Sequence, residues 1–137
     1  MPTRAVSTVL HFTLLVALVC VVVSTARADD PCDSAETQQD IEQCLQRESK
    51  LADSTLSFQL RKLEATMKGM RMTGQWALMS KEQKAWRVRT DAMCEWARKQ
   101  YSDDNRALAV YLIFKRRLMQ DRATEIAGTI DLLELAD

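Results

Sequence analysis

Apolar residues recur at three- and four-residue steps along three long stretches of the chain, which is the spacing of a buried helix face. The first stretch, 38–68, contains no glycine or proline, and its apolar positions run from Ile41 to Met67. The second stretch spans 81–101 and the third 106–127, with turn residues at 102–105 between them. Because no stretch alternates apolar and polar residues as a strand would, the sequence predicts an all-α fold, a small antiparallel helical hairpin or three-helix bundle.

The second stretch carries the most informative local pattern. Ser80 followed by Gln83 matches a capping box, which predicts that a helix begins at Lys81. Trp86 and Trp96 then share the helical spacing, so we expect both tryptophans on one bulky face of that helix.

Glycines mark the expected helix ends. Two of the three glycines lie in residues 69–79, so most of this segment is predicted to be a turn. Gly128 is predicted to end the third helix. The tail 129–137 keeps apolar residues and is expected to add a turn rather than fray.

Four methionines and one tryptophan lie close together in the sequence near the first predicted turn. They suit either a core at the bundle end or an adaptable surface for a partner. These residues are Met67, Met70, Met72, Met79 and Trp76.

The first 28 residues have the pattern of an export signal. Arg4 precedes the apolar run Val9 to Val23, and Ala26-Arg27-Ala28 is an A-x-A cleavage site. The run is shorter than the ~20 residues that a membrane span needs, which favours cleavage before Asp29 over a retained anchor. We therefore expect a signal peptide at 1–28 and one helical domain at 29–137, in the periplasm or secreted, with no membrane attachment after cleavage.

Signal cleavage would change the chemistry open to the protein. It would remove the only histidine, His11, and would leave 17 basic and 19 acidic residues. Without histidine the chain cannot perform Ser-His-Asp or Cys-His catalysis, and it cannot hold haem or zinc through imidazole. We predict that it is not an enzyme and has no catalytic residue, cofactor or metal site. Its nearly balanced charge argues against a nucleic-acid partner.

The charges are unevenly distributed along the chain. Residues 29–66 contain nine acids and four bases, whereas residues 67–101 contain eight bases and three acids. An acidic helix packed beside a basic helix would explain this distribution. Alternatively, an acidic face formed by Glu36, Asp40 and Glu42 could attract a cationic partner by electrostatic steering.

Three cysteines follow the predicted signal. Cys44 would lie about 10 Å up the first helix, and the residues after Cys32 can reach back about 16 Å, so a Cys32–Cys44 disulfide is feasible. Counting along straight helices places Cys94 about 15 Å from the level of Cys44, beyond disulfide reach. We predict a Cys32–Cys44 disulfide with Cys94 free, although a bend in the first helix would favour a bridge from Cys94 to Cys44 or Cys32.

These residues together resemble the LprI-type lysozyme-inhibitor N-terminal domain of bacterial periplasmic proteins. The resemblance covers most of the chain after the predicted signal, and its most specific part is the Gln-x-x-Trp run that leads to Asp-Ala-x-Cys. The matching positions are Cys32, Gln38, Cys44, Ala52, Asp53, Leu56, Gln83, Trp86, Asp91, Ala92, Cys94 and Arg122. The chain departs from the family pattern at Thr90, where an arginine is usual, and at Phe114, where a fourth cysteine is usual. We expect a Phe114 packing contact in place of a bridge between the second and third helices.

The resemblance implies a helical periplasmic interaction protein that inhibits a lysozyme or another cationic peptidoglycan-lytic enzyme. The alternative is a periplasmic chaperone or envelope-stress adaptor, because residues 79–83 are similar to the Leu-Thr-x-x-Gln element of CpxP/Spy-like helical chaperones. The lytic target, the binding face and the oligomeric state remain open at this point.

Overall fold

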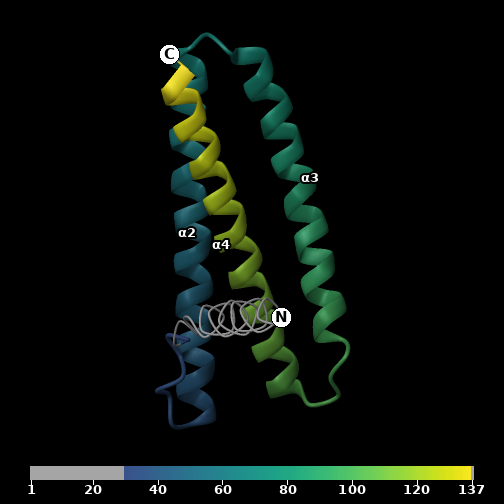
Figure 1. Ribbon diagram of the computed structural model, residues 1–137. Coiled ribbons are helices and arrows are strands. Elements are labelled where there is room, and N and C mark those ends of the chain that lie inside the picture. The colour runs from purple at the N-terminus through teal and green to yellow at the C-terminus, as the bar shows by residue number, and fades with distance from the viewer. Residues whose placement is uncertain (1–29, 137) are drawn as a thin grey trace, which may run out of the picture. The chain divides into compact units, whose positions relative to one another are not determined.

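Three long helices follow one another without a strand in the computed structural model, which describes residues 30–136. Helix α2 spans Gln38–Gly69, α3 spans Thr73–Arg98 and α4 spans Asp104–Ala136. Figure 1 shows that α2 and α4 run side by side in the same direction, and that α3 runs in the opposite direction on the other side of α4 from α2. The structure therefore confirms the predicted all-α fold. The predictions for residues 1–28 lie outside the described residues.

The boundaries of α2 agree with the sequence prediction because local interactions set them. The Thr37 hydroxyl accepts a hydrogen bond from the Asp40 backbone N–H at 3.1 Å, which caps the helix start. At the other end the chain turns sharply, and Arg71 adopts the left-handed backbone conformation with a φ of 61°. Only residues 70–72 separate α2 from α3.

The predicted start of α3 was wrong by eight residues. Ser80 and Gln83 lie inside the helix, so they do not form a capping box, and Met72 at the helix start makes no side-chain cap. The early start is explained by packing, because Met72, Trp76 and Met79 are half-buried against the main core. Their burial outweighs the weak helix propensity of Gly74. Met67, Met72, Met79 and Trp76 thus belong to the core at this end of the bundle.

Helix α4 continues well past its predicted end. Gly128 lies in its interior, and the helix extends through the tail to Ala136. Ile130 is 1% exposed and Leu133 packs against the core, so the tail has an apolar face to bury. This burial is what keeps the last two turns helical.

The main core lies between α2 and α4, which make most of the contacts between helices. Leu56, Leu63 and Ile126 are fully buried there. Helix α3 packs mainly on α4 and touches α2 at fewer places. A smaller cluster near the start of α2 joins Cys32, Cys44, Leu45 and Leu112.

Among the helices of residues 30–136, none has the length and apolar character needed to cross a membrane.

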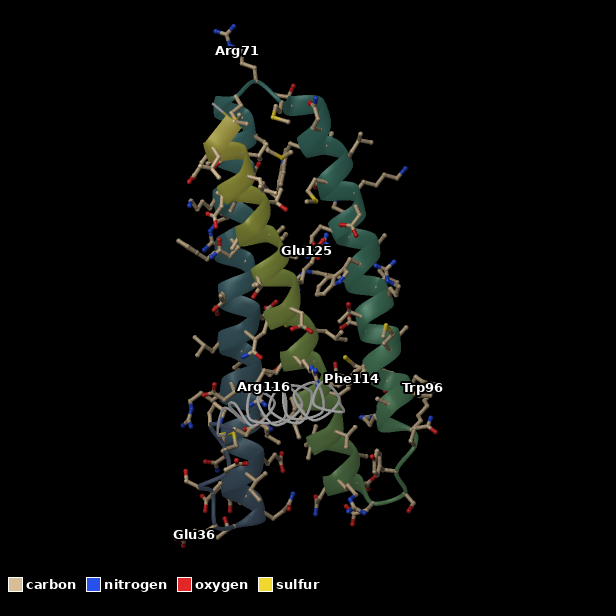
Figure 2. The ribbon with its side chains drawn as sticks, in the orientation of Figure 1. Glu36, Arg71, Trp96, Phe114, Arg116 and Glu125 are labelled. Carbon is tan, nitrogen blue, oxygen red and sulfur yellow. A yellow bond between two sulfur atoms is a disulfide. The ribbon has the colours of Figure 1, made fainter. Side chains whose placement is uncertain are left out.

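The two tryptophans predicted to share one face of α3 lie on different faces. Trp86 packs against the core, whereas Trp96 is 65% exposed and lies on the outer side of α3 (Figure 2). The buried residues of α3 are Gln83, Thr90, Cys94 and Ala97. The inward face is therefore polar at its centre, which a search for large apolar residues could not identify.

Candidate functional site

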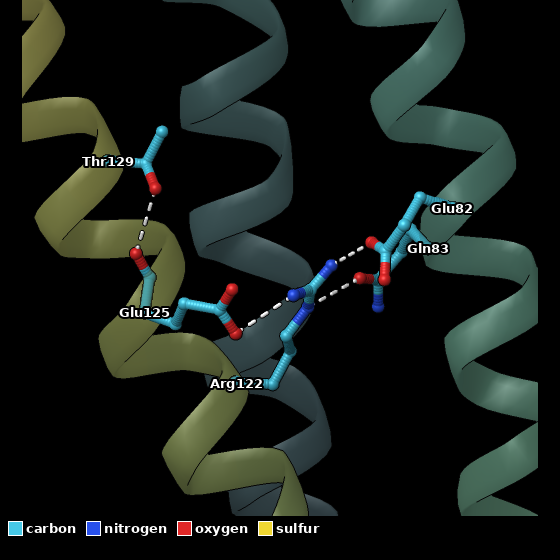
Figure 3. Close-up of polar contacts among 5 residues, drawn as sticks. All are labelled: Glu82, Gln83, Arg122, Glu125 and Thr129. Carbon is cyan, nitrogen blue, oxygen red and sulfur yellow. Dashed lines mark hydrogen bonds and ion pairs between the residues drawn. The ribbon is translucent and has the colours of Figure 1, made fainter.

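Arg122 of α4 is the centre of a polar network that ties α4 to α3. Its side chain is 7% exposed. The Nε atom donates a hydrogen bond to Gln83 Oε1 at 3.0 Å, and Nη2 donates to the carboxylate of Glu82. The Nη1 atom donates to Glu125 Oε2 at 2.8 Å, one turn further along α4 (Figure 3). All three nitrogens of the guanidinium are therefore paired.

An aromatic ring completes the surroundings of this guanidinium. Arg122 Cζ lies 5.7 Å from the centroid of the Trp86 ring, within the range of a cation–π interaction. A buried arginine is stable only when its charge and its donors are compensated. Trp86 and the three acceptors provide that compensation, and most of them come from α3.

A second polar connection joins α2 to α3. Arg87 Nη1 donates to Asp53 Oδ1 at 2.9 Å, and both side chains are more than a third exposed. An exposed pair of this kind contributes less than ~1 kcal/mol to stability. Its importance is therefore in positioning α3, which has few other contacts with α2.

Beside this pair, the three helices enclose a hollow of about 200 Å³, which we call the central polar hollow. Lys115 Nζ and Asp91 Oδ1 lie 3.7 Å apart at its border. The residues that line the central polar hollow are Ser49, Lys50, Asp53, Trp86, Arg87, Thr90, Asp91, Lys115 and Met119. Hydroxyl groups, both signs of charge and one aromatic ring suit this surface to recognition of a polar group.

The remaining cysteine lies close to the central polar hollow. Cys94 is a free thiol and is fully buried. Burial raises the pKa of the Cys94 thiol, while the nearby Lys115 ammonium acts in the opposite direction. Burial also lowers the pKa of Lys115, but its hydrogen bond to the Tyr111 hydroxyl at 3.3 Å and the charge of Asp91 raise it, and the net shift is upward. The thiol is therefore protonated at neutral pH and is not an activated nucleophile.

The other two cysteines are joined to each other. Cys32 and Cys44 form a disulfide with a Cα–Cα distance of 5.7 Å, which is the pairing that the helix rise allowed. The Ala35 N–H also donates to the Cys32 carbonyl at 3.1 Å. Together they hold the segment before α2 against the helix.

The acidic residues predicted to face a partner lie at the end of the molecule where α2 begins. Glu36 and Asp40 are exposed, whereas Glu42 is half-buried and accepts a hydrogen bond from Gln46 at 3.0 Å. Figure 1 places the start of α4 at this same end, and α4 begins at Asp104, directly after Asp103. We call these five residues the acidic end.

The structure brings most of the motif residues together around α3. Gln83, Trp86 and Arg122 are in direct contact, and Asp53 and Asp91 border the central polar hollow. The motif positions Ala52 and Leu56 belong to the main core, and Gln38 is exposed at the start of α2. Phe114 is half-buried and lies on the part of α4 that faces α3 (Figure 2).

Sequence analysis missed several charged residues of this region. Arg87, Lys115, Glu82 and Glu125 all pair with motif residues. Only the three-residue step from Arg122 to Glu125 gives a local signal. The other pairs join separate helices, which the sequence does not place side by side.

The Arg122 network is built from one arginine, two glutamates, one glutamine and one tryptophan. It has no histidine, and the one thiol is buried. Within residues 30–136, no three acidic, cysteine or histidine side chains converge as a metal site would require. What the arrangement can do is bind, through its charges, hydroxyls and aromatic surfaces.

Comparison with known proteins identifies one family. A family model described as lysozyme inhibitor LprI matches residues 28–126. This range covers all of α2 and α3 and most of α4, including every residue of the Arg122 network. Neither the curated proteins nor the solved structures give a match.

Proposed function

The chain belongs to the lysozyme inhibitor LprI family, and we propose that it is an exported interaction protein that inhibits a lysozyme or a related cationic peptidoglycan-lytic enzyme. The family match over residues 28–126 is the observation that carries this proposal. The family's name describes an inhibitor, which agrees with a site built for binding rather than for catalysis. An export signal at 1–28 would deliver the protein to the compartment where such enzymes act.

The acidic end is the surface that we propose for contact with the enzyme. Three residues of the acidic end, Glu36, Asp40 and Glu42, lie in the segment 30–43. This segment contains five acids in all and no base. Complementary charge accelerates encounter between an acidic surface and a cationic enzyme. The Cys32–Cys44 disulfide holds this segment in place, so less conformational freedom is lost on binding.

Some of these acids also have a structural role, and this decides which of them to test. Asp40 accepts a short hydrogen bond from the Thr37 hydroxyl at 2.6 Å and lies in the first turn of α2, where negative charge stabilises the helix. Glu36 precedes the helix and makes no ion pair with another described residue. Glu36 and Glu42 are therefore better test positions than Asp40.

The test is an activity assay on the protein that begins at Asp29, which contains the whole compact unit Pro31–Asp137. A small panel of c-type, g-type and bacterial lytic enzymes is titrated with micromolar protein. We expect at least one enzyme to be bound and to lose turnover. Full activity of every enzyme, with no binding detected, would contradict the proposal.

The chaperone alternative is tested with the same protein. Its motif ends at Gln83, which is buried against Arg122 rather than presented on the surface. We expect the protein not to slow the aggregation of an unfolded client. Suppressed aggregation together with an inactive inhibitor assay would favour the chaperone.

A further inference from the structure

Gln83 has a hydrogen-bond donor that no group in the described structure satisfies. The residue is 7% exposed, and its Oε1 accepts from Arg122 Nε at 3.0 Å. Because a guanidinium can only donate, this contact identifies the oxygen of the amide and leaves the nitrogen on the other branch. Gln83 Nε2 is buried and has no partner among residues 30–136, and Figure 3 draws no contact to it. Such a group calls for a water or a ligand.

Gln83 lines a hollow of about 230 Å³ between α2 and α3, which we call the α2–α3 hollow. Its apolar walls are Leu60 and Trp76, both of which pack against the main core. This volume is below the ~300–1,000 Å³ of pockets for drug-sized ligands. The α2–α3 hollow therefore suits a small molecule with an apolar body.

The polar groups around the α2–α3 hollow offer donors and positive charge. Arg61 and Lys84 line it, are exposed, and form no ion pair with a described residue. The one acidic residue of the lining, Glu64, is paired with Lys68 at 2.7 Å. A ligand placed here must therefore supply the acceptor and the negative charge.

We propose that the α2–α3 hollow binds a small monocarboxylate with an apolar body. Its carboxylate accepts a hydrogen bond from Gln83 Nε2 and is attracted by Arg61 and Lys84, while its body lies against Leu60 and Trp76. Water alone would satisfy the amide, but it would not use the apolar walls. The apolar walls also disfavour a phosphate ion, which has no apolar body to bury. This site is separate from the acidic end and does not depend on the proposed inhibition.

Octanoate is the probe, and the protein beginning at Asp29 is labelled with ¹⁵N. We expect the side-chain NH₂ signals of Gln83 to shift on titration, with a dissociation constant on the order of millimolar for so small a ligand. Octanol has the same body without the charge, and octylammonium has the opposite charge. Both should bind at least tenfold more weakly than octanoate. Equal binding of the three compounds would overturn the proposal. So would the absence of any shift of the Gln83 signals at roughly 10 mM octanoate, a concentration about tenfold above the expected dissociation constant.

Two variants locate the site. Gln83→Glu retains an acceptor for Arg122, removes the amide donor and repels a carboxylate, so octanoate binding should be lost while the melting temperature shows that the protein is folded. The double variant Arg61→Gln/Lys84→Gln leaves the core untouched and should weaken octanoate severalfold. Its matched control, Lys81→Gln/Arg89→Gln, removes two exposed charges of α3 that do not line the α2–α3 hollow. Unchanged octanoate affinity in Gln83→Glu, or equal losses in the two double variants, would contradict the assignment.

Discussion

Arg122 shows how one side chain can specify the position of a helix. Two of its three acceptors, Gln83 and Glu82, come from α3, and the third, Glu125, comes from its own helix. A shift of α3 along α4 by one residue would leave a buried charge without its partners. Because that loss is costly, the network selects a single register for the two helices.

We predict that Arg122→Met lowers the free energy of unfolding by about 2 kcal/mol. The Glu82 and Glu125 side chains are 48% and 64% exposed and would regain water, so most of the cost is the unsatisfied Gln83 oxygen and lost packing on Trp86. Urea denaturation measures the change. Arg117→Met is the control, because Arg117 is exposed on the same helix, and it should change stability by less than about 0.5 kcal/mol. Equal effects of the two substitutions would contradict the role of the network.

Cys94 links burial to the pH dependence of stability. Burial raises the pKa of its thiol above the ordinary value of 9.0. Between the unfolded and the folded pKa, the unfolded state has lost the proton and the native state has kept it. Stability from this group is thus fully present below pH 9 and is lost as the pH rises through the folded pKa.

We predict that raising the pH from 8 to 10, a range that brackets the ordinary cysteine pKa of about 8.5–9, lowers the free energy of unfolding of the native protein. The same change in pH should lower that of the Cys94→Ala variant by less. Urea unfolding of both proteins at each pH measures this difference, which contains the contribution of Cys94 together with that of Lys115, whose pKa depends on Cys94. A thiol-reactive dye at pH 7 should label Cys94 only after urea unfolds the protein. Rapid labelling of the native protein, or identical pH dependence of the two proteins, would show that the thiol is accessible.

At the scale of the helix, tertiary burial explains where α3 and α4 depart from their predicted ends. Both helices run through a glycine that was expected to mark a boundary, Gly74 in α3 and Gly128 in α4. Glycine costs about 1 kcal/mol inside a helix. Trp76 near the first and Ile130 near the second bury enough apolar surface to outweigh that cost.

We predict that Gly128→Ala raises the free energy of unfolding by about 1 kcal/mol, because alanine has a higher helix propensity. A methyl group at this position would meet no atom within 4 Å, so no clash offsets the gain. Chemical denaturation measures the change. Gly69→Ala should give a smaller gain, because Gly69 is the last residue of α2 and helix propensity matters less at a helix end than in its interior. A loss of stability in Gly128→Ala would mean that α4 does not continue through this residue.

Local signals explain which boundaries could be predicted. The start of α2 is set by Thr37 and Asp40, which are three residues apart and contact each other. The start of α3 has no side-chain cap at all. The pattern Ser80–Gln83 mimicked one because Gln83 is polar for a different reason, its contact with Arg122.

At the scale of the whole molecule, the helix arrangement collects charges that are distant in the sequence. Because α2 and α4 run in the same direction, the residues near both of their starts lie at one end (Figure 1). The acids Glu36 and Asp104 thereby lie at the same end of the molecule, to which α3 also brings its last residue, Arg98. Arg71 lies at the opposite end, on the turn between α2 and α3 (Figure 2).

We predict that Glu36→Lys/Glu42→Lys slows association with a cationic lytic enzyme by roughly tenfold at low salt, because steering depends on local charge. Stopped-flow or surface-binding kinetics measures the rate constant. The control Asp121→Lys/Asp131→Lys changes net charge by the same amount at exposed positions in the second half of α4. It should have a much smaller effect. The difference should vanish near 1 M salt, where the Debye length is about 3 Å, and equal slowing by both variants would contradict the assignment of the binding face.

The sequence by itself determined the all-α class, the three helices of residues 30–136 and the extent of α2, because helical periodicity and end caps depend on residues a few positions apart. The tertiary structure decided where α3 begins, how far α4 extends and which face of α3 is buried. It also brought Gln83 within hydrogen-bond distance of Arg122, 39 residues away. Contacts between helices depend on how their faces pack, and the buried surface and paired charge gained there outweigh local propensity.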